Sequence, residues 1–111
     1  MNAFEIPGLR FSLPAGDAVE RARFVSVDTD GAGKQADATS PVIGASMNKT
    51  NAGEVLEIAD GIVMVTASAA IDAGAGVKSD ANGKAVTAST GAIGVAITSA
   101  TAADQLISVK L

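Results

Sequence analysis

Residues 70–97 read A-I-D-A-G-A-G-V-K-S-D-A-N-G-K-A-V-T-A-S-T-G-A-I-G-V-A-I, and this stretch decides the fold. Asn82-Gly83 predicts a two-residue hairpin turn, because both residues tolerate the positive φ that a type I′ turn requires. A glycine-rich bend at 73–77 leads into one strand, and β-branched residues at 86–87 mark the next. After a turn at Gly91, large apolar residues alternate with small ones at the period of a strand. The stretch predicts strand, turn, strand, turn, strand.

An earlier part of the chain repeats this turn chemistry. The pattern D-x-x-G-K at 30–34 precedes the same pattern at 80–84 by fifty positions, and Ile-Gly at 43–44 precedes Ile-Gly at 93–94 by the same fifty. We therefore expect an internal duplication. The alternative is two ordinary hairpins with common turn residues, because alanine and glycine match easily by chance in this chain. The expected copies are residues 15–58 and 73–109.

The remaining segments predict further short strands, and hence an all-β fold. Residues 18–23 could form a helical turn or a strand, whereas 24–27 favour a strand. Another strand is expected at 42–45, and L-I-S-V-K-L at the C-terminus alternates as a closing strand. Two alternating runs, 55–58 and 62–65, are separated by Asp60-Gly61, which predicts a second hairpin turn.

The composition predicts one domain with a thin core. A chain of 111 residues fits one domain of ordinary size. Hydrophobic residues make up 48% of it, but alanine is the commonest of them and aromatic residues are only 3%. Burial of a methyl group contributes little at ~25 cal/mol per Å² of apolar surface. We therefore expect part of the stability to come from association with other subunits.

The charge argues against nucleic acid and membrane partners. The formal net charge is −4, whereas nucleic-acid binding favours a clustered basic face. No apolar run approaches the ~20 residues that cross a bilayer. Glu5 and Pro7 stand where a signal peptide would be basic and then apolar. The sequence predicts a soluble protein without a recognisable export signal.

The candidate chemical motifs are incomplete, so we expect no enzyme and no catalytic residue, cofactor or metal site. The chain has no Cys and no His, which removes the usual thiolate ligands, bases and nucleophiles. Gly33-Lys34 and Gly83-Lys84 lack the first glycine and the hydroxyl residue of a phosphate loop. Residues 28–31 begin like a calcium loop, but the glycine comes two positions too early and no glutamate closes the ring. A turn capped by its own aspartate side chains explains them better.

The N-terminal segment, residues 1–13, is the most apolar stretch outside the hairpins. Pro7-Gly8 interrupts it and prevents a regular helix. An extended arm and a first strand of the domain explain it equally well. As an arm it would leave residues 14–111 as the domain, and its apolar side chains would be the candidates for binding a partner. Those candidates are Phe4, Ile6, Leu9 and Phe11.

The order of these motifs resembles the capsid decoration, or cement, proteins of tailed bacteriophages. The resemblance runs from about residue 15 to residue 111 and is best in 71–111, whereas 1–13 lies outside the well-matched region. Its motifs are turn and strand patterns of moderate specificity. They are A-G-x-x-V at 73–77, D-x-x-G-K at 80–84, I-G-x-A at 93–96 and L-I-S-V-K-L at 106–111.

The resemblance implies a small β-clip or β-tulip domain with an N-terminal arm. It implies a homotrimer on the outer capsid surface, at threefold and quasi-threefold positions, where it binds the major capsid protein and stabilises the shell. Such a protein is made in the cytoplasm of the host bacterium and ends in the virion. Two other classes stay open. One is a different phage structural domain, from a tail or fibre, and the other is a small β-clip module that handles sugars or nucleotides.

Overall fold

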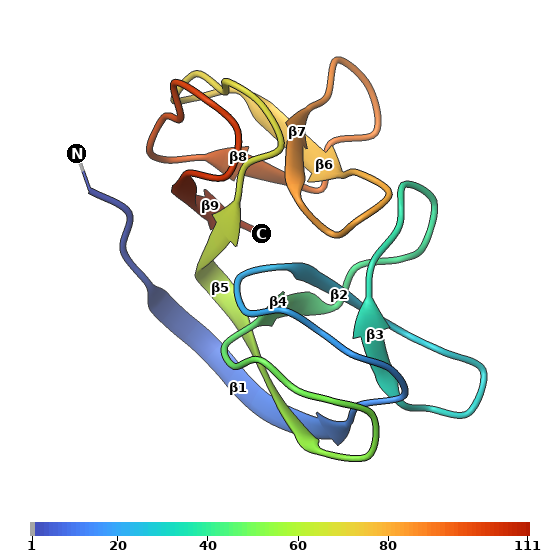
Figure 1. Cartoon of the computed structure of the whole chain (residues 1–111). Coiled ribbons are helices and arrows are strands. Elements are labelled where there is room, and N and C mark those ends of the chain that lie inside the picture. Colours follow the sequence, from blue (N-terminus) through green and yellow to red (C-terminus); the bar gives the residue numbers. More distant parts are fainter. Residues whose placement is uncertain (1) are drawn as a thin grey trace.

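The computed structural model describes residues 2–111, which form one curled, nine-stranded antiparallel sheet (Figure 1). The described residues contain no helix, which confirms the predicted all-β fold. The strands are β1 (Ile6–Pro14), β2 (Phe24–Val27), β3 (Gly33–Gln35), β4 (Gly44–Ser46), β5 (Val55–Thr66), β6 (Gly76–Ser79), β7 (Ala85–Thr87), β8 (Gly94–Ala96) and β9 (Leu106–Lys110).

Strand β5 is the centre of the sheet. The strand order is β3-β2-β4-β5-β9-β8-β6-β7, and β1 pairs with β5 outside this path. The first part of β5 pairs with β4, the second part pairs with β9, and β1 runs antiparallel along it from Ile62 to Val55. Residues 6–14, for which an arm and a strand were both open, thus lie in the sheet. Met1, the first residue of the expected arm, lies outside the described residues.

The two halves of the chain follow the same path. We call residues 6–60 the first half and residues 61–111 the second half. The β2–β3 and β2–β4 pairs of the first half correspond to β6–β7 and β6–β8 of the second. The β4–β5 pair likewise corresponds to β8–β9. Strand β5 therefore closes the first half and opens the second.

The β2–β3 and β6–β7 turns have the same hydrogen bonds. The Asp28 amide donates to the Ala32 carbonyl at 2.9 Å, and the Asp80 amide donates to the Lys84 carbonyl at 2.8 Å. Asp28 is thus the structural equivalent of Asp80, two positions before the residue that the sequence match aligned with it. The hairpin predicted at Asn82-Gly83 is present, but its turn spans residues 80–84, and of the two only Gly83 has positive φ. It is therefore not a two-residue type I′ turn.

The hairpin turn predicted at Asp60-Gly61 is wrong. Strand β5 continues through both residues, and Gly61 is the partner of Pro7 on β1. Gly61 has a φ of 105°, and a Cβ atom on it would lie 2.6 Å from the Gly8 nitrogen. The pairing of β1 with β5 is irregular here, between Pro7 and Arg10. The glycine thus permits a close approach of two strands at a bulge, a second use of glycine that the Asp-Gly signal does not distinguish from a turn.

The core consists of two hydrophobic clusters. The smaller, which we call the first-half core, contains Leu56 and Ile58 of β5 with neighbours from the first half, and the half-buried Phe11, Leu13 and Ile43 pack against it. The larger contains the inward residues of the second half, including Val63 and Val65 of β5. Residues from the outer side of the first-half sheet complete the larger cluster. These are Phe24, Ala36, Ala45 and Ala59.

Candidate contact surface on the first strand

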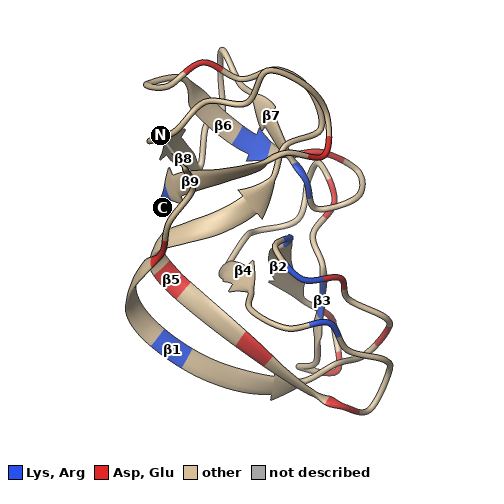
Figure 2. Cartoon of the chain, turned by 60° about the vertical axis from the view of Figure 1, so that its left-hand side comes forward, with Lys and Arg blue, Asp and Glu red and all other residues tan. Residues whose placement is uncertain are grey.

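Strand β1 forms an exposed edge beside β5. Figure 2 shows the two strands in front with few charged positions along them. Arg10 is the one charged residue of β1, and Glu57 and Asp60 are those of β5. An edge strand leaves one row of backbone groups without a strand partner. The edge therefore combines free hydrogen-bonding groups with few charges.

The structure separates the four predicted contact residues into two pairs. Ile6 and Leu9 are exposed, each with 61% of its surface accessible. Phe4 and Phe11 are half-buried, and Phe11 packs against the first-half core. Ile6 and Leu9 lie on either side of the irregular pairing at Gly8. They are the members of the set that a partner can reach most fully.

The segment before β1 is tied to β9, the last strand of the chain. The Ser108 hydroxyl of β9 accepts a hydrogen bond from the Phe4 amide at 2.6 Å and donates one to the Phe4 carbonyl at 2.6 Å. Ser108 is fully buried. Glu5 adds a long ion pair with Arg21, at 3.9 Å. The chain before β1 thus lies across β9, a contact between opposite ends of the sequence that no local pattern reveals.

Among residues 2–111, sequence reasoning missed six exposed large apolar residues, three of which are relevant to contact with a partner. Val55 is 61% exposed and pairs with Pro14 at the far end of β1, beside a shallow pocket of about 210 Å³. Val95 and Ile97, at β8, are 46% and 37% exposed. Their alternation with small residues was a visible signal of a strand. It did not show which of the two strand faces would be left uncovered.

The polar loops contain one open cleft of about 260 Å³, between residues 37–42 and strand β6. Asp37, Ser40 and Lys78 lie in its wall. The Asp37 Oδ1 accepts hydrogen bonds from the Thr39 and Ser40 amides at 2.9 and 2.7 Å. These bonds, with the Thr39 amide first and the Ser40 hydroxyl next, hold the pKa of Asp37 well below its ordinary value. The carboxylate therefore serves to shape its own loop.

A second carboxylate fastens the loop before β9. The Lys84 ammonium donates to Asp104 Oδ1 at 2.8 Å, and this bond, with the lysine charge, lowers the pKa of Asp104. A carboxylate whose pKa is lower in the folded state stabilises it above the unfolded pKa and loses that effect as the pH falls through the folded value. The relevant window for Asp37 and Asp104 therefore lies below the ordinary value of 3.8.

We expect the melting temperature to change little between about pH 7 and pH 5 and to fall below about pH 4, in part because these two carboxylates become protonated. Circular dichroism melts across this range measure the effect. The double variant Asp37→Asn, Asp104→Asn keeps an oxygen acceptor at both positions but cannot titrate there, so its acid loss should be smaller. A loss as large as that of the native chain would contradict the assignment.

The calcium-like segment forms a turn, as expected, whereas the first phosphate-loop-like pair lies in a strand. Asp28 Oδ1 accepts hydrogen bonds from the Asp30 and Ala32 amides at 2.8 and 3.0 Å, so the calcium-like segment is a turn capped by its own aspartate. Gly33-Lys34 lies in strand β3 with no helix after it. Over residues 2–111, no three His, Cys, Asp or Glu side chains gather as metal ligands would. The same residues include no helix long and apolar enough to cross a membrane.

The geometry defines a small all-β protein whose most developed surface feature is a strand edge with exposed apolar side chains, suited to contact with another protein. A family model described as phage cement protein matches residues 6–111. The chain belongs to this family. It is thus a structural protein associated with the phage particle and its capsid. The resemblance found in the sequence is confirmed, and it extends through β1.

A solved structure shares the fold. The crystal structure of the head fiber gp8.5 N base in bacteriophage phi29 matches with a TM-score of 0.77 and 17% sequence identity, over 91% of each chain. At this identity the likeness concerns the fold alone. No curated protein matches the sequence.

Proposed function

We propose that the protein binds the outer surface of the assembled capsid as a homotrimer, at threefold and quasi-threefold positions, and stabilises the shell by contacting the major capsid protein. Membership of the cement family supports this proposal, together with the exposure of Ile6 and Leu9 on the free edge of β1. A ligand that binds the assembled shell and not its separated parts stabilises the shell by mass action.

The contact is centred on the N-terminal end of β1. Ile6 and Leu9 are its exposed anchors, and Phe4 lies beside them, held by Ser108. Phe11 supports the strand from the core side. Three copies of a weak contact on one trimer bind far more tightly than one copy, because the second and third contacts form at high effective concentration.

The double variant Ile6→Ser, Leu9→Ser tests this contact. Both side chains are exposed in the free protein, so the fold should be kept, whereas capsid binding should weaken at least tenfold, because ~1.4 kcal/mol of lost contact is already a factor of ten. Co-sedimentation with undecorated capsids measures binding, and the temperature at which the shell opens measures protection. Deleting residues 1–10 is a blunter test, because it also removes the first part of β1 from β5.

Val55→Ser is the matched control. Val55 is as exposed as Ile6, but it lies opposite Pro14 at the other end of β1. It should leave binding and the opening temperature unchanged. Equal weakening by both variants would mean that the contact is not centred on the N-terminal end. Full binding and protection by the double variant would refute the role of Ile6 and Leu9.

A second candidate is the base of a longer fibre on the phage head. The fold likeness to the phi29 head fiber base, over 91% of both chains, favours it. Electron microscopy of decorated particles distinguishes the two. A cement protein forms a low layer of density on the shell, whereas a base carries a projecting fibre.

A further inference from the structure

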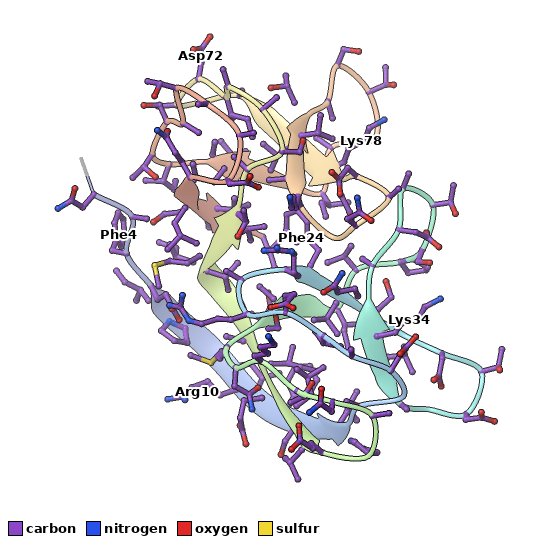
Figure 3. All side chains as sticks on the ribbon, viewed as in Figure 1. Phe4, Arg10, Phe24, Lys34, Asp72 and Lys78 are labelled. Carbon is purple, nitrogen blue, oxygen red and sulfur yellow. The ribbon has the colours of Figure 1, made fainter. Side chains whose placement is uncertain are left out.

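The two halves of the chain make an unequal contact with each other. The outer side of the first-half sheet covers the core of the second half, through Phe24, Ala36, Ala45 and Ala59. Figure 3 shows Phe24 between the two halves. The contact is heterologous, because one half contributes its outer side and the other its inner side. In a heterologous contact between two equivalent units, the inner side of one unit and the outer side of the other are left without a partner.

Among the described residues, the outer side of the second half has no such cover: the segment before β1 lies over it at Ser108 but leaves Val95 and Ile97 exposed. The residues of this outer side follow from the shared strand pairing: Val95 pairs with Lys110 as Ala45 pairs with Ala59. Ala45 is 2% exposed, because the second half covers it, whereas Val95 is 46% exposed. Met47 packs against the larger cluster, whereas its equivalent, Ile97, is 37% exposed. We call residues 76, 88, 95, 97 and 110 the second-half outer surface.

The unused inner side lies over the first-half core, where Leu56 and Ile58 are fully buried but the residues that pack against the cluster are partly exposed. In the second half, the covered residues Val63 and Val65 of β5 are 1% and 0% exposed. Their equivalents on β1, Phe11 and Leu13, are only half-buried. Within residues 2–111, no segment covers the first-half core as the first half covers the second.

The β6–β7 turn secures the internal contact. The Phe24 amide donates to the Gly83 carbonyl at 2.7 Å, and the Gln35 side chain donates to the Asn82 carbonyl at 3.1 Å. Gly83 is buried in this contact. The equivalent β2–β3 turn contains Gly31, which is exposed, and a Cβ atom added there would have no atom within 4 Å. The first-half turn therefore has the same geometry and no corresponding contact.

We infer that the second-half outer surface of one chain covers the first-half core of a second copy, with the Gly31 turn of that copy docked at Gly76 and Ala88. The contact repeats between chains the packing that already joins the halves within one chain. A heterologous contact of this kind closes into a ring when its rotation allows closure. The inference rests on the self-association in the proposed function and names the surfaces that carry it.

Charge agrees with this pairing. The second-half outer side carries Lys78 and Lys110 where the first half has Ser26 and Ala59. The first-half turn carries Asp30 where the second-half turn has Asn82. At these positions, the surfaces that would meet between chains thus carry opposite charges. Those that meet within the chain are neutral at the same positions.

Cysteine cross-linking tests the inference, because the native chain has no cysteine. In the internal contact Gln35 touches Asn82, so the equivalent pair between chains is Thr87 and Asp30. The full-length variant Asp30→Cys, Thr87→Cys should give dimers and trimers with a short bismaleimide, both in concentrated solution and on capsids. The variant Gln35→Cys, Asn82→Cys should cross-link only within one chain. Asn51→Cys, Thr87→Cys, with both sites exposed, measures random collision.

Oligomers from the Asp30–Thr87 pair in clear excess over the Asn51–Thr87 pair would support the inference. Equal yields from both pairs would overturn it, and so would a chain that stays monomeric in solution and on capsids. Val95→Asp adds a second readout: it should abolish the oligomers and leave the melting temperature of the monomer unchanged. Oligomers that survive this change would also count against it.

Capsid co-sedimentation in the same samples separates the two claims. Chains that bind capsids without the expected cross-link would overturn this inference and leave the capsid contact standing. Chains that cross-link as expected but do not sediment with capsids would refute the proposed function and support the inference.

Discussion

Gly83→Val will lower the free energy of unfolding by about 3–4 kcal/mol, the sum of a backbone and a packing penalty. Gly83 has a φ of 76°, which costs a residue with a side chain about 1–2 kcal/mol. In addition, its Cβ atom would lie 3.0 Å from the Phe24 carbonyl oxygen and 3.2 Å from the Arg23 Cβ. The new side chain would therefore push the turn away from the first half. Urea unfolding at low protein concentration measures the loss.

Gly31→Val is the matched control. Gly31 occupies the equivalent place in the β2–β3 turn, with a φ of 81°, but no atom lies within 4 Å of an added Cβ. It should cost only the backbone penalty of about 1–2 kcal/mol. Equal losses in the two variants would show that the contact of Gly83 with the first half contributes nothing to stability.

Phe24→Ala will have the largest effect of any single truncation, about 3–5 kcal/mol. Phe24 is fully buried and lies where the first half covers the larger cluster. Its removal leaves a cavity between the halves that small alanine neighbours cannot fill. Since a domain of this size has a stability of only about 5–15 kcal/mol, the variant should unfold well below the native melting temperature. Calorimetry or a circular dichroism melt records the shift.

Phe11→Ala provides the comparison with the same change of side chain. Phe11 is half-buried on the edge strand, so its truncation removes fewer contacts and leaves a site that solvent can reach. Its cost should be clearly smaller than that of Phe24→Ala. If Phe11→Ala proves the more damaging change, the smaller cluster holds the fold together and the junction between the halves does not.

The class of the fold could be predicted because turn chemistry and strand alternation are local. The alternation of Ile93, Val95 and Ile97 and the turns at 28–32 and 80–84 were visible in the sequence. The continuity of β5 could not be predicted, because Asp60-Gly61 has the composition of a hairpin turn. Only the close approach of β1 explains the glycine at position 61. Long-range contacts decide such cases.

The contact surface was predictable only in part, for a related reason. The apolar character of residues 4–11 could be read directly, but which side chains face outward depends on the pairing of β1 with β5. The irregular register at Gly8 leaves Ile6 and Leu9 exposed and turns Phe11 toward the core. Val95 and Ile97 could be predicted as strand residues. Their exposure could not, because it depends on no other described segment packing against this part of the outer side of the second half.

Strand β5 belongs to both halves, and this determines how the protein unfolds. The strand supplies the last ladder of the first half and the first ladder of the second within one uninterrupted backbone. If either half unfolds, β5 loses hydrogen-bond partners, and the other half depends on β5 as well. Local opening of one half therefore spreads to the other, and the chain should melt in one cooperative transition despite its two clusters. Hydrogen exchange should accordingly find the β5 amides on both sides of Gly61 equally slow, opening only with the whole molecule.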